Sequence, residues 1–315
     1  MRVGVILNSA EPAEGIARCR ALGVDCVGLM RDALPGFDRA RYAGVPDGKF
    51  LRSAVQQYAE AGIQVAAVAK PYCMGKDPDI VLNPARHRRE IDEMLATIMA
   101  VADAGVPTML QYVHVALPED PGKDAALWSG VRQIFRECVR QAESSRLRLA
   151  NHGRWPTPDR AARKQAQDAG TRPADYRRFR IPGWEGPFLI RDGEHIARLI
   201  EREAPSPYNG VCMCTGMYMN GTDVFAAAAR FKGKVFFAQP RDLRGRWPQV
   251  EEVMPGEGEI DLPRFLRLLA KDGYTGMVHP EHFEDTRRNS PDPEADAVQT
   301  VKRWVAEATH ATPRR

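Results

Sequence analysis

Four residues that can donate an atom to a metal ion each stand at the end of a short apolar run. They are His152, Cys214, Gln239 and Glu281, and the runs are RLRLAN (146–151), GVCMC (210–214), KVFFAQ (234–239) and GMVHPE (276–281). A lone histidine or cysteine in such a place is more often a hydrogen-bonded or core side chain. Donors at four successive run ends instead predict one shared site. The mixture of nitrogen, sulfur and oxygen suits Mn²⁺, Fe²⁺ or Zn²⁺ better than Mg²⁺.

The thiol of Cys214 is expected at the mouth of this site, because it closes its run. Cys212 stands two residues earlier, so in an extended strand it points the same way, one layer deeper, and packs as core. The C-x-C spacing is not that of a C-x-x-C redox pair. The remaining cysteines stand singly and are expected to be thiols, which is typical of a reducing compartment, here the cytoplasm.

Eight apolar runs alternate with amphipathic stretches along the chain. The first four lie at 2–7, 26–30, 64–69 and 108–113, and the other four are those that end at the donors. Several amphipathic stretches stop at a glycine just before the next run, as in RALGVDCVGL, AEAGIQVAAV, ADAGVPTML and AKDGYTGMV, which is a common helix end. This alternation predicts an α/β fold, a (β/α)8 TIM barrel formed by residues 1–315 as a single domain. An open doubly wound sheet is the alternative, although LNSAEPAEG after the first run lacks a glycine-rich phosphate loop.

The segment 153–189 interrupts this alternation after the fifth run. It is long and rich in arginine, and it also contains Trp155, Tyr176, Phe179 and Trp184. Long connections in compact domains are usually functional or disordered. We therefore expect an insertion that forms a lid, with a solvated insertion as the alternative, and a frayed tail at 308–315.

The net charge of +4 is mildly basic, which allows a small anionic substrate but does not call for nucleic acid. No apolar run approaches the ~18 residues of a membrane span, so no membrane association is expected. We expect a homo-oligomer.

The segment VCMCTGMYMNGTDVFAAAARFKGKVFFAQPRDL resembles the mannonate dehydratase family, within the wider xylose isomerase-like TIM barrels. That family has Cys-Thr-Gly after its sixth strand and His-x-Arg-Asn at the end of its seventh. HGRWP and HPEHF stand in the places of its His-Pro-Asp-Asp-Pro and Arg-Pro-Asp-His-Gly motifs. The resemblance extends from residue 146 to about residue 285.

Carried over position by position, the resemblance implies that His152, Cys214, Gln239 and Glu281 bind the divalent cation, Mn²⁺ first among the candidates. Gln239 replaces a histidine of the family and Glu281 an aspartate. The implied reaction is the dehydration of a sugar acid through a metal-stabilised enediolate.

Three further residues are expected to act on the substrate. His282 is expected to transfer a proton, because imidazole titrates near neutrality. This requires a turn at His282, since adjacent side chains of an extended strand point in opposite directions. Arg241 is expected to bind the substrate carboxylate, and Tyr218 either supplies the second proton or packs.

Three alternatives remain. A sugar or sugar-acid isomerase or epimerase would use the same proton abstraction without a leaving group. A DNA-repair endonuclease of the same superfamily would need a cluster of ligands for several zinc ions, which seven scattered histidines do not favour. A metal-poor binding protein or pseudoenzyme is the alternative outside enzymes.

Overall fold

The computed structural model describes residues 1–9, 11–38, 43–73, 78–113, 115–117, 121–153, 188–218, 223–246, 249–282 and 290–310. Most of the expected insertion at 153–189 and the tail residues 311–315 lie outside these ranges. The predictions made for them therefore have no structural counterpart here.

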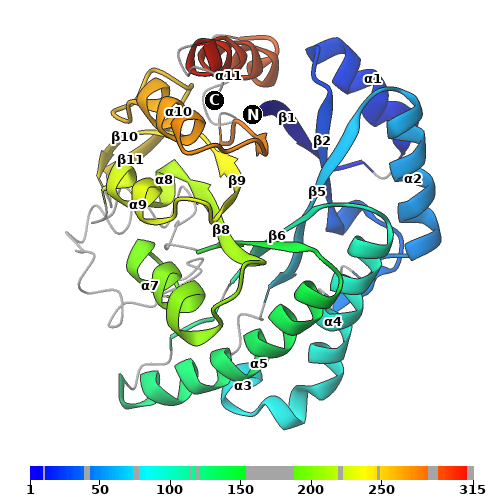
Figure 1. The fold of residues 1–315 in the computed structure, drawn as a ribbon, viewed down its shortest axis with the longest axis vertical. Helices are drawn as coiled ribbons and strands as arrows, with labels where there is room; N and C mark the ends of the chain where they lie inside the picture. The colour runs from blue at the N-terminus through cyan, green and yellow to red at the C-terminus, as the bar shows by residue number, and fades with distance from the viewer. Residues whose placement is uncertain are drawn as a thin grey trace.

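Eight parallel strands close into a barrel (Figure 1). In order around the barrel they are β1 (Arg2–Leu7), β12 (Met277–Val278), β9 (Val235–Gln239), β8 (Asn209–Cys214), β7 (Arg148–His152), β6 (Thr108–Tyr112), β5 (Gln64–Cys73) and β2 (Cys26–Met30). Apart from the pair β1–β12 that closes the ring, neighbours follow chain order, as β-strand–helix–β-strand units require. The predicted TIM barrel is confirmed, and the open doubly wound sheet is excluded.

Helices lie around the outside of the barrel (Figure 1). They are α1 (Pro12–Leu22), α2 (Gly48–Glu60), α3 (Asp79–Leu82), α4 (Arg88–Asp103), α5 (Asp124–Ser144), α7 (Gly193–Arg198), α8 (Thr215–Tyr218), α9 (Val224–Arg230), α10 (Leu262–Lys271) and α11 (Pro293–His310). The glycines predicted to end helices, Gly23, Gly62, Gly105 and Gly273, all have positive φ, as helix C-termini favour. None of the helices in the described ranges is both long and apolar enough to cross a membrane.

Within the described ranges, apolar side chains form two buried clusters. The larger lies between the strands and the helices and includes Val27, Val211 and Leu266. The smaller lies inside the barrel and includes Leu110 and Cys212. Along β8, Val211, Cys212 and Met213 alternate between the two clusters because successive side chains point to opposite faces. The inward-facing residues at the carboxyl ends of the strands are thus the ones left to form a site.

Three differences from the expected elements concern the end of the chain. Pairing of β12 stops at Val278, and Pro280 follows, which has no backbone N–H to donate to a neighbouring strand. Strands β10 (Asp242–Arg246) and β11 (Gln249–Val253) form an antiparallel hairpin after β9 that the sequence did not predict. Helix α11 continues to His310, so the start of the expected frayed tail is helical.

Candidate metal centre

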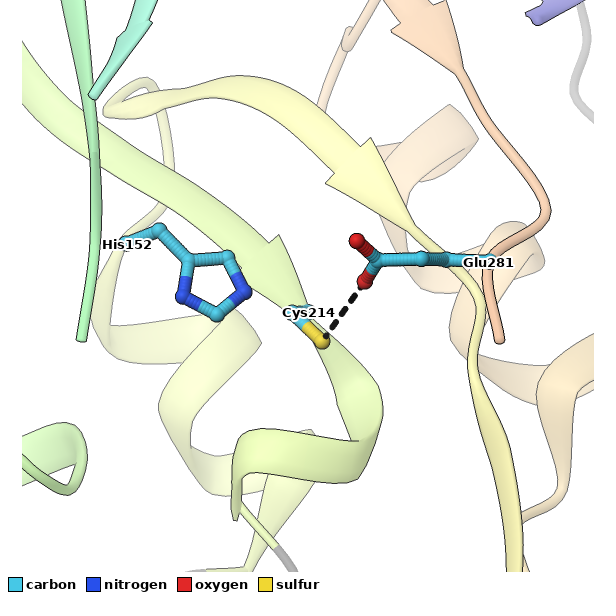
Figure 2. Close-up of side chains that lie close together, drawn as sticks. All are labelled: His152, Cys214 and Glu281. Atoms are coloured by element: carbon cyan, nitrogen blue, oxygen red, sulfur yellow. Dashed lines mark hydrogen bonds between the residues drawn. The ribbon is translucent and has the colours of Figure 1, made fainter. Parts of the chain in front are cut away.

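Three predicted donors converge at the carboxyl end of the barrel. One ligand atom each from His152, Cys214 and Glu281 lie within 4.8 Å of one another. Figure 2 shows the Cys214 side chain between the other two, with His152 on β7 and Glu281 on the segment that follows β12. Because the barrel strands are parallel, their last residues meet at one rim, which is what brings these distant positions together.

His152 has the chemistry of a neutral metal ligand. Its Nδ1 donates to the carbonyl oxygen of Gly153, which leaves the lone pair on Nε2. Nε2 is buried and has no hydrogen-bond partner in the described part of the chain. Burial lowers the pKa of His152 to about 4, so the ring is neutral near pH 7. Tyr112 stacks on it, with ring centroids 4.4 Å apart, and holds its orientation.

Cys214 and Glu281 form the other half of the centre. Sγ of Cys214 lies 3.6 Å from Oε2 of Glu281. Burial, with the nearby carboxylate, raises the pKa of Cys214 to about 12. Burial would also raise the pKa of Glu281, but at the low pH where this carboxyl titrates, the positive charges of His282, His152 and Arg241 outweigh burial and hold its pKa at about 2. A cation between the side chains would replace the thiol proton and balance the carboxylate.

Gln239 lies in a different arrangement from the other three predicted ligands. It is fully buried, and its Oε1 accepts a hydrogen bond from Sγ of Cys212 at 3.0 Å. Cys212 packs inside the barrel, as predicted. The amide oxygen of Gln239 is thus bonded to the thiol one layer below, whereas its buried Nε2 has no hydrogen-bond partner among the described residues. Gln239 could act as a ligand if the amide turned over and pointed its oxygen toward the centre.

His282 lies on the rim in a left-handed backbone conformation, with φ of +62°. This is the turn that the sequence predicted at this position. Its Nδ1 lies 3.2 Å from Oε1 of Glu252, and its Nε2 lies 3.6 Å from Oε1 of Glu281. The side chain is 43% exposed, so the ring can meet a substrate while remaining between two carboxylates.

Arg241 is buried beside the centre. One terminal nitrogen of its guanidinium donates to Oε1 of Glu252. Its backbone N–H donates to Oγ1 of Thr215 at 2.8 Å. A Cβ on Gly216 would lie 2.7 Å from Cδ of Arg241, so the side chain passes over a glycine. The guanidinium of Arg241, expected to bind a substrate carboxylate, is thus paired with the carboxylate of Glu252. Glu252 is a site residue that the sequence did not predict.

The two tyrosines differ in their access to the site. Tyr218 is fully buried and does not line the cavity, which favours the packing role. Tyr112 lines the cavity, and its hydroxyl donates to Oε1 of Glu281 at 3.3 Å. Burial raises the pKa of Tyr112 well above its usual value, so its hydroxyl keeps its proton. Tyr112 is the phenol placed to meet a substrate.

A cavity of about 700 Å³ opens beside the centre, and of the three converging donors Glu281 lines its wall. The polar part of its wall includes Arg18, Tyr112, Glu252, His279, Glu281 and His282. Its volume is within the range of small-molecule sites. Because its wall carries both carboxylates and cationic groups, it suits a small polar molecule better than an apolar one.

Residues 178–308 match the family described as xylose isomerase-like TIM barrel. Among solved structures, the chain is similar to mannonate dehydratase from Streptococcus suis serotype 2, with TM-score 0.73 and 17% identity over 100% of this chain and 96% of that one. It is also similar to a D-tagatose 3-epimerase-like protein, with TM-score 0.69 and 12% identity over 99% of both chains. A third is the IOLI protein with a binding zinc atom, with TM-score 0.67 and 13% identity over 100% of both chains. At identities of 12–17% these similarities show a shared fold and not a shared reaction.

Proposed function

From the xylose isomerase-like TIM barrel fold of this chain, we propose that it is a metal-dependent lyase that dehydrates a small sugar acid. The observation that carries the proposal is the group of His152, Cys214 and Glu281, of which Glu281 lines the wall of a polar cavity together with His282. A mannonate dehydratase among the structural neighbours supports this reaction class.

The donor set supports a catalytic cation more than a structural one. Structural zinc sites are usually closed by four protein ligands, whereas catalytic sites keep a position open for water or substrate. Three donors converge here, and the amide of Gln239 is bonded to Cys212 instead. A divalent cation would supply Lewis-acid polarisation of a substrate carboxylate, which makes the neighbouring C–H more acidic. We propose Mn²⁺, with Fe²⁺ or Zn²⁺ as alternatives.

The protein's own groups then have distinct tasks. His282 moves a proton between the substrate and its Nε2, which faces Glu281 rather than Glu252. Tyr112 donates a hydrogen bond on the same side of the cavity. The cationic groups around Glu281, His282 first and Arg241 among them, hold its pKa low and so keep the carboxylate ready to bind a cation.

An isomerase or epimerase is the second candidate, and the epimerase neighbours favour it. These include the D-tagatose 3-epimerase-like protein and an L-ribulose 3-epimerase, which has TM-score 0.63 and 16% identity. Such an enzyme removes the same kind of proton and returns it to the other face. The product separates the two: a dehydratase yields a 2-keto-3-deoxy acid, and an epimerase yields an isomer of equal mass.

The test begins with metal analysis of the purified protein, followed by loading with Mn²⁺. The loaded protein is then incubated with five- and six-carbon aldonic acids and ketoses in D₂O, and products are followed by mass spectrometry and NMR. We expect about one ion per chain and a product that has lost one water and carries a deuterium from the solvent at C3. If the protein bound no metal and no substrate took up deuterium, the metal-poor binding protein would be the surviving alternative.

A further inference from the structure

We propose that Glu252 is a positioning residue, which holds His282 and Arg241 in place at the rim of the metal centre. The inference builds on the proposed function, because it explains how the rim is kept ready for proton transfer. Glu252 lies on β11, outside the barrel strands, yet its side chain is only 7% exposed and forms part of the cavity wall.

One oxygen atom of Glu252 contacts both basic residues. Oε1 accepts from the guanidinium of Arg241, and it lies 3.2 Å from Nδ1 of His282. Arg241 is buried, and a buried guanidinium needs an ionised partner to offset its desolvation. Glu252 meets this need and at the same time supplies an acceptor for the imidazole.

The contact with Glu252 determines which histidine nitrogen is available. If Nδ1 donates to Glu252, the proton of the neutral ring lies on Nδ1, and Nε2 carries the lone pair on the side of Glu281. χ angles of an exposed side chain rotate within nanoseconds, and the contact with Glu252 restrains this rotation of the His282 ring. Glu252 therefore sets both the tautomer and the orientation of His282.

The hairpin that carries Glu252 is anchored by a second buried carboxylate. Asp242 lies at the start of β10, and its two oxygens accept backbone N–H groups from Leu243, Gly256, Gly258 and Ile260 at 2.8–3.3 Å. These bonds tie the loop after β11 back to β10. Glu252 pairs with Leu243 across the hairpin. The carboxylate is thus presented from a braced element, as precise positioning requires.

The first experiment compares Glu252→Ala with the native enzyme and with Glu251→Gln. Glu251 is the matched control, because it is an exposed neighbour on the same strand and pairs with Arg244 at 3.4 Å. In Glu252→Ala we expect kcat to fall about 10- to 100-fold, the usual effect of losing a partner that orients a site residue. KM and metal content should stay within about threefold of native. Glu252→Gln keeps an acceptor oxygen for His282 but not the charge opposite Arg241, and should restore part of kcat. Equal loss of kcat in the alanine and glutamine variants, or native kcat in both, would overturn the positioning role.

The second measurement does not depend on turnover. In protein labelled with ¹⁵N-histidine, the ring signals of His282, identified by their loss in His282→Asn, report which nitrogen carries the proton. We expect the Nδ1–H tautomer of His282 in native protein and in Glu251→Gln. In Glu252→Ala we expect a mixture of the Nδ1–H and Nε2–H tautomers. Should that variant not fold, Arg241→Met with Glu252→Leu replaces the buried ion pair by apolar groups, and the same mixture is expected. An unchanged Nδ1–H signal would refute the proposal, whereas the expected change in a protein inactive on every acid tested would refute only the proposed function.

Discussion

Sγ of Cys214 lies 3.6 Å from Oε2 of Glu281, although 67 positions separate the two residues in the chain. Cys214 is the last residue of β8, whereas Glu281 lies on the irregular segment after β12. These strands are not neighbours, because β9 lies between them. The contact therefore reaches past β9 at the rim of the barrel rather than joining adjacent strands, as expected of two ligands that share one ion.

Replacing Cys214 by alanine should lower the bound metal sharply. The change removes one of three converging donors and leaves His152 and Glu281 in place. Metal per chain, measured by inductively coupled plasma mass spectrometry after dialysis, is expected to fall at least about tenfold. Cys212→Ala is the control, since that thiol points into the barrel toward Gln239 and should leave occupancy intact. Metal loss in Cys212→Ala with full occupancy in Cys214→Ala would reverse this assignment.

Gln239 allows a separate test of the number of ligands. If its amide stays bonded to Cys212, Gln239→Leu should keep about one ion per chain, because no donor atom is removed. If the amide is the fourth ligand, the same variant should lose metal as severely as Cys214→Ala. Competition with a chelator of known affinity measures the difference.

Metal affinity should increase with pH. The free thiol of Cys214 has a pKa raised to about 12 by burial, so a cation that binds the thiolate releases one proton. Over about pH 5 to 9 the logarithm of the association constant should then rise by about one per pH unit. Below about pH 4 it should fall more steeply, because His152, with its pKa lowered to about 4, also becomes protonated. Calorimetric titration in buffers of different ionisation enthalpy counts the protons, and the thiol contribution should vanish in Cys214→Ala.

His282→Asn should separate turnover from binding. Asparagine retains a polar side chain but cannot exchange a proton near neutral pH, so turnover should fall roughly 10² to 10⁴-fold. Metal content and substrate affinity should stay close to native, and exchange of the substrate C2 proton with D₂O should slow if His282 is the base. Full turnover would move the proton transfer to Tyr112, which lies on the same cavity wall. Loss of metal would instead identify His282 as a ligand.

The fold was largely predictable because its signals are local. Near-continuous apolar runs and the glycines that end the helices recur along the chain, and seven of the eight strands lie within a few residues of the predicted bounds. The last strand was predicted too long, since burial continues past Val278 although Pro280 cannot donate to a ladder. The β10–β11 hairpin was missed because RDLRGRWPQVEEV is rich in charge and resembles a loop.

The site was predictable only where its residues end strands. His152, Cys214 and Glu281 could be placed because the carboxyl ends of barrel strands meet at one rim. Glu252 could not, because nothing local distinguishes it from Glu251, and its partners lie on other segments. The sequence also favoured Tyr218, which follows Cys214 closely, over Tyr112. Parallel register places Tyr112 beside His152 instead, a relationship between strands that spacing along the chain does not reveal.

An ion pair on the cavity wall should make stability depend on pH. Arg18 joins α1 to the start of α11 through Asp292 at 2.7 Å and Glu294 at 2.5 Å. The hydrogen bonds from Arg18 lower the pKa of Asp292 to about 2. A carboxylate with a lowered folded-state pKa adds stability above its unfolded pKa, near 3.9, and this contribution disappears as pH falls through about 2.

Arg18→Gln should therefore reduce the free energy of unfolding near pH 7 by at most about 1 kcal/mol, because the pair is partly exposed and screened by solvent. The difference from native protein should shrink below about pH 4 and vanish near pH 2. Urea unfolding at several pH values measures it, with Arg20→Gln, an exposed position on the same helix, as the control. A difference between Arg18→Gln and native protein that stays constant down to about pH 2 would show that Arg18 stabilises the closure of the barrel by packing rather than by its charge.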